Sequence, residues 1–408
     1  MTPSVHETPS AALHRANDAD TRASLVAHAR ALRPVLEKNV QQTEQARRVA
    51  EDSIAALKAA GIFRTMVPRR HGGFEGSVRT HLEVTAAVAE GCGSTAWVVA
   101  LTNVCAWFTG LFAARAQDDV FGTNPDARVA GVFSPSTQVR RVEGGIVTSG
   151  KWFWSSGCLH ADWAMLGLLE LDAAGNPLNQ YLALMPMSEL TIEDTWFTAG
   201  MKGTGSNCVV AKDVFVPEHR LLPLMKAVAG EFETPFKDEV SYRSAFIPVA
   251  ALVLVGAQLG MARAALAHVI EKASQRSIAY TSFKKQSDSV AFQMQVSKAA
   301  LKIDTAHLHA FRAADDIDEA ALRGELLDYK TRARVRADTG YVAQYATDAI
   351  NLLMTAHGAG SFADASPMQR LWRDANTAAR HAIVLQPVGE EIYGKALLGV
   401  ENTVTPLV

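Results

Sequence analysis

Two hydroxyl-rich segments have residue types that could hold a polar ligand. The run WSSG places Ser155 and Ser156 beside Trp154, and the Gly203–Ser206 loop (GTGS) adds two hydroxyls with little side-chain bulk. A hydroxyl can donate and accept a hydrogen bond, and glycine lets the backbone approach a ligand closely. Both segments therefore indicate a ligand site, with two plain β-turns as the alternative interpretation.

His381 is the residue whose type best fits proton transfer. An imidazole has an ordinary pKa near about 6.5, which suits acid–base catalysis around neutral pH. His381 follows the run WRDANTAAR about one helical turn after Thr377, which predicts that both side chains share one helix face. The alternative is a structural role, which is the more common one for a lone histidine.

Motifs for metals and nucleotides are missing from the sequence. Cys158 and His160 have no second ligand pair nearby, so we expect no metal site. No GxGxxG opens a helix, and neither GxxxxGK[ST] nor GxSxG occurs. Four widely scattered cysteines in a long chain are typical of free thiols in a reducing compartment, so we expect a cytoplasmic protein.

The composition excludes several kinds of partner. The 40 Lys+Arg and 42 Asp+Glu leave a formal charge of −2, which provides no overall field for nucleic acid or an anionic membrane. No run of about 18 uninterrupted apolar residues predicts a membrane span, and the polar N-terminal stretch lacks the apolar centre of a secretory signal. We therefore expect neither nucleic acid nor membrane as a partner.

The spacing of apolar residues divides the chain into three parts that must position these side chains. Helical spacing at the N-terminus gives way to a period of two between about residues 128 and 219, and helical spacing then returns. The run GSTAWVVALTNVCAWF is so apolar that it predicts a helix buried on most faces. We predict an α+β protein with a helical N-terminal domain (20–125), a central β-barrel or sandwich (126–225) and a C-terminal four-helix bundle (240–408).

Three segments carry a resemblance to a known family. They are SGKWFWSSGCLHADW (Ser149–Trp163), EDTWFTAGMKGTGSNCVVAKDVFVPEHR (Glu193–Arg220) and SPMQRLWRDANTAARHAIV (Ser366–Val384). With the helical–β–helical order, they resemble the acyl-CoA dehydrogenase fold. More narrowly, the chain is similar to oxygenase components of two-component flavin monooxygenases. These include p-hydroxyphenylacetate hydroxylase, the secosteroid phenol hydroxylase and dibenzothiophene monooxygenase.

The resemblance implies an activity and a set of residues. A separate NAD(P)H:flavin reductase would supply FMNH2 or FADH2, and dioxygen would form a C4a-hydroperoxyflavin that oxygenates an aromatic substrate. Family members usually form tetramers through the bundle, so a homotetramer is implied. Ser156 would lie nearest flavin N5, and His381 would engage a phenolic hydroxyl. The implied flavin contacts are Trp154, Ser155, Ser156, Trp196, Thr204 and Ser206, with Arg276, Phe283 and Gln293 at the flavin phosphate or a neighbouring subunit.

The implied substrate pocket departs from the family at Cys105. The aromatic hydroxylases usually have histidine at this place in the segment NVCAWFTGLF, so the pocket would lose one polar contact to a phenol. The change favours a bulkier or less polar aromatic, such as a fused ring or an indole-like heterocycle. We expect Trp107 and Ser134 in the same pocket. The alternative places Cys105 in the helix core, away from substrate.

Other functions stay open at this point. An acyl-CoA dehydrogenase-like flavoenzyme needs a catalytic carboxylate, and this chain has GEEIYGKALLG where those enzymes commonly carry a YEGT-like segment. Oxygenation at nitrogen or sulfur, and flavin binding without catalysis, are the remaining alternatives. The sequence separates neither FMN from FAD nor one aromatic substrate from another.

Overall fold

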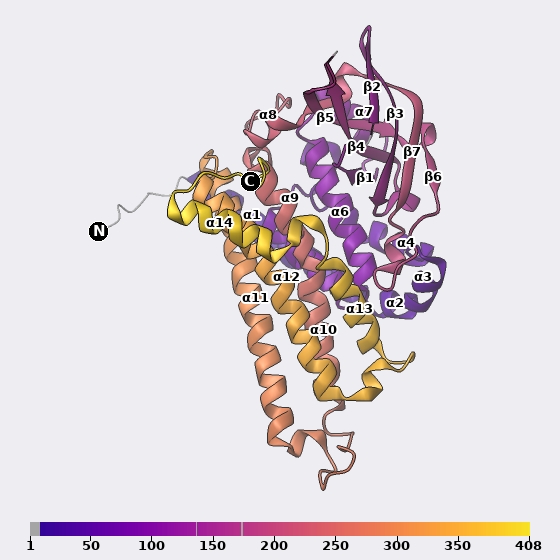
Figure 1. Cartoon of the computed structure of the whole chain (residues 1–408), viewed down its shortest axis with the longest axis vertical. Coiled ribbons are helices and arrows are strands. Elements are labelled where there is room, and N and C mark those ends of the chain that lie inside the picture. The colour runs from indigo at the N-terminus through magenta and orange to yellow at the C-terminus, as the bar shows by residue number, and fades with distance from the viewer. Residues whose placement is uncertain (1–8, 136, 173) are drawn as a thin grey trace, which may run out of the picture.

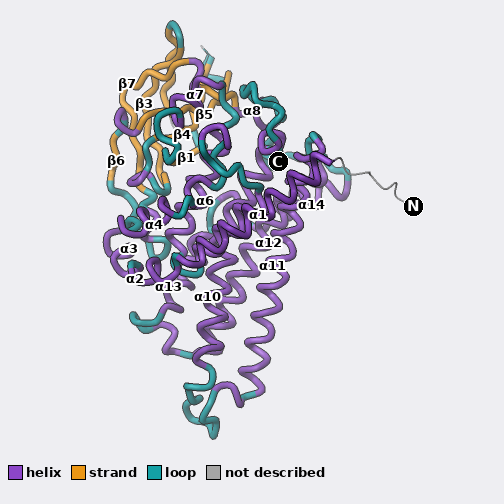
Figure 2. Tube along the Cα trace, turned by 180° about the vertical axis from the view of Figure 1, so that it is seen from behind, coloured by secondary structure: helices purple, strands orange, loops and turns teal. Residues whose placement is uncertain are grey.

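The computed structural model describes residues 9–135, 137–172 and 174–408. The strands gather at one end of the long axis, and long helices extend to the other end (Figures 1 and 2). The predicted order of helices, strands and helices is therefore confirmed, as is the predicted fold class.

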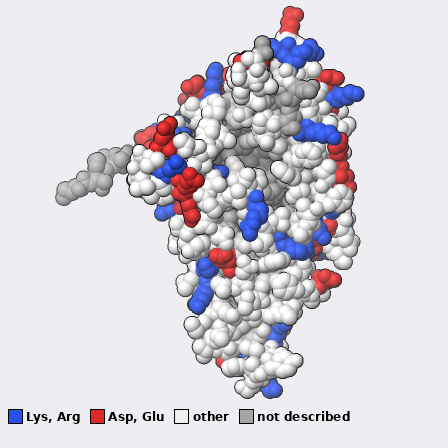
Figure 3. Space-filling model, in the orientation of Figure 1, with Lys and Arg blue, Asp and Glu red and all other residues white. Residues whose placement is uncertain are grey.

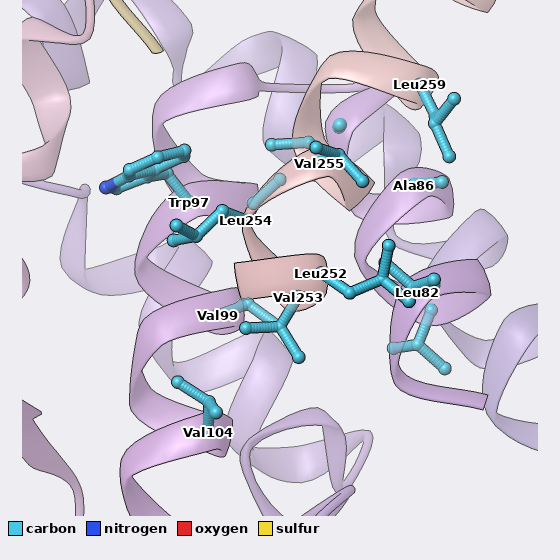
Figure 4. Packing of buried hydrophobic residues seen from close by; sticks show 14 of the residues in the cluster. Leu82, Ala86, Trp97, Val99, Val104, Leu252, Val253, Leu254, Val255 and Leu259 are labelled. Atoms are coloured by element: carbon cyan, nitrogen blue, oxygen red, sulfur yellow. The ribbon is translucent and has the colours of Figure 1, made fainter. Parts of the chain in front are cut away.

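One of the N-terminal helices, α6, is buried almost completely. Every residue of α6 except Leu101 is buried, which agrees with its apolar sequence. Figure 4 shows Val99 of α6 beside Val253, and Leu82 of the neighbouring helix beside Leu252. These helices are α1 (Pro9–Ala31), α2 (Arg33–Lys38), α3 (Val40–Ala46), α4 (Glu51–Ala59), α5 (Val78–Ala89), α6 (Gly93–Thr109) and α7 (Ala114–Phe121).

The central part consists of two four-stranded sheets, β1-β4-β5-β8 and β2-β3-β7-β6. The pairings are antiparallel except that β1 pairs with β4 in parallel, and the crossover between them contains β2 and β3. Residues from both sheets, including Trp152 and Leu168, share one core. The strands are β1 (Val129–Val132), β2 (Thr137–Val142), β3 (Gly145–Ser155), β4 (Trp163–Leu171), β5 (Pro177–Pro186), β6 (Thr191–Glu193), β7 (Asn207–Pro217) and β8 (Leu221–Pro223).

The C-terminal helices form a closely packed bundle. Gly260 lets α10 approach α5, because a Cβ atom there would lie 2.0 Å from the Ala86 carbonyl oxygen. Alanines such as Ala310 and Ala314 are fully buried in α11 and allow similarly close packing. The helices are α8 (Leu224–Val228), α9 (Phe246–Leu252), α10 (Gly256–Lys272), α11 (Val290–Arg323), α12 (Tyr329–His357), α13 (Pro367–Ala378) and α14 (Gln386–Leu398).

The stretch Phe246–Lys272, which contains α9 and α10, has the length and apolar composition of a membrane span. In its most apolar window, however, 83% of the residues are buried inside the protein. This burial is typical of a core helix, and Figure 4 shows Leu252, Val253 and Leu254 of this stretch packed against α5 and α6.

Candidate active site

A chain of hydroxyl groups lies where strand β3 ends. Trp97 of α6 donates its indole N–H to Ser156 Oγ at 3.2 Å, and the Ser156 and Ser206 hydroxyl oxygens are 2.7 Å apart. Ser206 Oγ lies 2.6 Å from Thr204 Oγ1, which donates to the Met201 carbonyl oxygen at 2.9 Å. The structure therefore brings together the two hydroxyl-rich segments noted in the sequence, in a buried position.

The direction of these hydrogen bonds follows from the carbonyl at one end. Because the Met201 oxygen can only accept, Thr204 donates to it and accepts from Ser206, and Ser206 in turn accepts from Ser156. The Ser156 oxygen also accepts from Trp97. With these assignments the Ser156 proton is already used and one oxygen lone pair is free, so Ser156 is an acceptor toward a ligand.

A β-bulge at the end of β3 separates two neighbouring side chains. The register with β7 shifts between Trp152 and Ser155, and Trp154 has a φ of 65°, which a bulky residue rarely adopts. The Trp154 side chain is exposed, whereas Ser155 is buried and its hydroxyl finds no partner among the described residues. Backbone strain and an unpaired buried hydroxyl both cost stability, and such features concentrate at functional sites.

Helix α13 holds the loop that carries Thr204 and Ser206. The buried Asp374 carboxylate accepts the backbone N–H of Met201, and Trp196 donates its indole N–H to the Met201 carbonyl oxygen at 2.9 Å. Burial raises the pKa of Asp374 to about 6. Trp196, one of the expected flavin contacts, is thereby fixed next to the hydroxyl chain.

His381 lies beyond the end of α13, so the prediction that it shares a helix face with Thr377 is wrong. The last turn tightens, with the Arg380 N–H bonded to the Thr377 carbonyl oxygen and the His381 N–H bonded to that of Ala378. His381 is the N-cap residue of the short 3₁₀ helix η11 (Ala382–Val384), and its Nδ1 accepts the Ile383 backbone N–H at 3.3 Å. Its ring centre is 5.9 Å from that of Trp97.

The environment of His381 keeps its imidazole neutral. Desolvation by the surrounding protein, and to a smaller extent the positive charge of Arg336, lowers the pKa of His381 to about 4, although the residue is exposed. Since Nδ1 accepts a backbone N–H, the neutral ring carries its proton on Nε2. Trp97 lies between this donor and Ser156, because it contacts both.

The three residues expected in the substrate pocket do not lie together. Cys105 is buried and faces β1, where a Cβ atom on Gly131 would lie 2.6 Å from its Sγ. Trp107 is two residues further along α6 and therefore points elsewhere, donating its indole N–H to the Ser241 carbonyl oxygen at 2.9 Å. Ser134 is exposed just after β1. Burial raises the pKa of the Cys105 thiol to about 12, so it stays protonated.

Arg276, Phe283 and Gln293 lie at the far end of the bundle, around the connection between α10 and α11 (Figure 1). Arg276 donates to His357 Nε2 at 2.8 Å, and Gln293 donates to the Ser287 carbonyl oxygen at 2.8 Å. Within one chain this end is separated from the hydroxyl chain by the length of the helices. These three residues therefore do not join Ser156 in a single chain.

Two site residues could not be recognised from the sequence alone. Trp97 stands in an almost uniformly apolar helix, where it looks like any other core residue. Arg336 lies on a long helix with several other arginines, and only its burial distinguishes it. Among the described residues, no group of three or more His, Cys, Asp or Glu is placed to hold a metal ion.

Comparison with known proteins places the chain among flavoenzymes. Residues 252–386 match the acyl-CoA dehydrogenase C-terminal domain, and residues 20–121 match the acyl-CoA dehydrogenase N-terminal domain. The flavin-dependent monooxygenase oxygenase subunit HsaA of Rhodococcus jostii (strain RHA1) is 32% identical over 92% of this chain and 98% of its own length. The oxygenase component of p-hydroxyphenylacetate 3-hydroxylase from Acinetobacter baumannii is 30% identical over 90% of this chain and 87% of its own.

A solved structure supports the same relationship. XiaF from Streptomyces sp., in complex with FADH2 and glycerol, is 38% identical and superimposes with a TM-score of 0.91. The superposition covers 96% of this chain and 99% of XiaF. The similarity therefore extends across all three parts of the fold.

Proposed function

The chain belongs to the oxygenase components of flavin-dependent monooxygenases with the acyl-CoA dehydrogenase fold, and we propose from this that it oxygenates an aromatic substrate with reduced flavin. A separate NAD(P)H:flavin reductase would supply FMNH2 or FADH2. The observation that carries the proposal is the buried hydroxyl chain that ends at Ser156 beside Trp97.

The residues at the end of β3 fit a flavin ring. Ser155 has a buried hydroxyl without a partner among the described residues, and the exposed Trp154 offers an aromatic face next to it. Ser156, Thr204, Ser206 and Trp196 would complete the binding surface. When bound, a reduced flavin supplies the electrons that activate dioxygen for transfer of one oxygen atom to the substrate.

Ser156 would select the oxidation state of the flavin. Its free lone pair accepts a hydrogen bond, and reduced flavin has an N–H group at N5 whereas oxidised flavin has none. The Trp97 ring covers the same region and helps to exclude water from it. This role follows from the order of donors and acceptors in the hydroxyl chain.

His381 would act as a hydrogen-bond donor to the substrate. Its Nδ1 is occupied by the Ile383 N–H, so Nε2–H is the group available to a phenolic or other ring oxygen. A pKa of about 4 keeps this donor neutral across the physiological range. The role differs from a general base, which would need a free imidazole lone pair.

Aromatic side chains beside Cys105 support an aromatic substrate. Phe108 and Phe133 have ring centres 4.9 Å apart, and Phe108 and Phe246 have ring centres 4.7 Å apart. We place the substrate near this cluster, with Cys105 as a small apolar part of its wall, which favours a fused or indole-like ring. The indole-3-acetate monooxygenase of Pseudomonas putida is 29% identical to this chain, over 86% of this chain and 89% of its own length.

A homotetramer would bring the two ends of the fold together. Met294, Leu301 and Leu308 recur every seven residues on α11 and are 53%, 63% and 71% exposed, which makes one apolar stripe. Figure 3 shows few charged side chains over the lower part of the molecule. Packing of such faces between copies would let Arg276 and Phe283 of one copy approach the flavin of another. Four buried free cysteines are consistent with a cytoplasmic enzyme.

A coupled reaction under 18O2 tests the proposed function. The protein is incubated with a flavin reductase, NADH, FMN or FAD, and a panel of phenols and indoles, and products are measured by mass spectrometry. We expect one 18O atom per product molecule, and substrate-dependent suppression of hydrogen peroxide release. Absence of labelled product with both flavins, together with bleaching of bound flavin by an acyl-CoA, would instead identify a dehydrogenase.

A further inference from the structure

Among the described residues, Arg336 of α12 is a buried charge whose Nε and Nη1 atoms have no hydrogen-bond partner. The residue is 7% exposed. Two neighbours on the same helix differ, because Arg332 donates to the Val408 carbonyl oxygen and Arg334 pairs with Asp316. Burial lowers the pKa of Arg336 only to about 10, so the guanidinium stays charged at neutral pH.

The start of α14, which packs on α12 at Arg336, also favours anions. Helix α14 packs directly on α12 here, since a Cβ atom on Gly389 would lie 2.7 Å from the Arg336 carbonyl oxygen. The first turn of α14 has no acidic residue, and Leu385 provides no side-chain cap for its free backbone N–H groups. A helix N-terminus and an unpaired guanidinium both attract negative charge.

The same region adjoins His381. The η11 helix, which begins directly after His381, packs against α12. The positive charge of Arg336 is close enough to His381 to lower its pKa, in addition to the effect of burial. Arg336 therefore lies on the substrate side of the proposed site, whereas Arg276, the expected phosphate contact, lies at the far end of the bundle.

We propose that Arg336 binds a carboxylate group of the aromatic substrate, so that this oxygenase acts on aromatic acids. The inference rests on the proposed function, because it assigns His381 to the substrate side. A planar guanidinium with free N–H groups can bind a carboxylate through two parallel hydrogen bonds. A substrate that brings this carboxylate would neutralise the charge that the folded chain leaves unpaired.

Binding of acids and their amides tests the proposal without turnover. The full chain is titrated by calorimetry with indole-3-acetate and indole-3-acetamide, and with 4-hydroxyphenylacetate and its amide. We expect at least one acid to bind about tenfold or more tightly than its amide, as a charge-assisted pair allows. The preference should vanish in Arg336→Met, persist in part in Arg336→Lys and be unchanged in the control Arg332→Met.

Several results would overturn the proposal. One is equal binding of acids and amides, or no binding of any acid, by the unmodified protein. A second is loss of reduced-flavin affinity in Arg336→Met, which would assign the guanidinium to the flavin phosphate. A third is a lower assembled mass or a lower unfolding temperature of Arg336→Met, which would indicate a structural partner. If the acid preference is found but no 18O-labelled product forms, the proposed function fails and the carboxylate site stands.

Discussion

Replacing Thr204 with valine should change which oxidation state of flavin the protein prefers. The substitution keeps the shape of the side chain and removes its hydroxyl. The Met201 carbonyl oxygen keeps the Trp196 indole N–H at 2.9 Å and the Thr204 backbone N–H at 3.2 Å, so it stays satisfied. Ser206 loses its acceptor, and its proton can then turn toward Ser156. Ser156 would then be free to donate to a ligand.

The size of the effect follows from one hydrogen bond. A neutral hydrogen bond contributes about 0.5–1.5 kcal/mol, which corresponds to roughly 3- to 10-fold in affinity. In the unmodified chain Ser156 accepts, which suits the N5–H of reduced flavin. In Thr204→Val it can donate, which suits the bare N5 of oxidised flavin. The ratio of the oxidised to the reduced Kd should therefore fall by about 3- to 10-fold.

Anaerobic titrations with dithionite-reduced and oxidised FAD or FMN measure both dissociation constants. Thr204→Ser is the matched control, because it keeps the hydroxyl and should keep the preference of the unmodified protein. Equal changes in both dissociation constants would contradict the assigned direction of the hydroxyl chain. So would a control that behaves like Thr204→Val.

Three further predictions concern other parts of the molecule. Since the pKa of His381 is about 4, a pH profile of kcat/KM should show no ionisation of this residue between about pH 5.5 and 7.5. The variant His381→Ala should slow product formation about tenfold or more without weakening flavin binding. Burial raises the pKa of Asp318 from 3.8 to about 7, so the folded chain keeps a proton that the unfolded chain releases, and stability falls as pH rises between these values. Asp318→Asn should remove this fall in the free energy of unfolding between about pH 4 and 7, as urea titrations would show, although Asn keeps only one of the two oxygens that accept the Val78 and Arg79 backbone N–H groups. Leu308→Glu should lower the assembled mass measured by light scattering, and an unchanged mass would exclude the α11 stripe as an interface.

The fold could be predicted because local patterns and tertiary structure agree. The change from helical spacing to a period of two, and back, marks the β-domain in the sequence, and the apolar run of α6 is buried as expected. The parallel pairing of β1 with β4 was not predictable in this way. It depends on where the chain returns after the β2–β3 hairpin, which no local pattern records.

The candidate site was predictable only in part. Ser156, Thr204 and Ser206 stand in short recognisable runs, and the structure brings them within hydrogen-bond distance. Trp107 and Cys105 are close in sequence but point to different sides of α6, since residues two apart on a helix differ by about 200°. Arg336 becomes noticeable only when burial and missing partners are known, and both are properties of the folded chain.

Helix α6 carries residues from both ends of the proposed site. Trp97 lies at the proposed flavin side, Cys105 faces the proposed substrate wall, and their offset of eight residues spans about 12 Å at the α-helical rise. A change within α6 would thus alter the cofactor end and the substrate end together. Engineering of substrate scope should instead begin at Phe133, directly after β1, because its replacement can enlarge or narrow the wall, whereas a Cβ atom at Gly131 would press on Cys105 of α6.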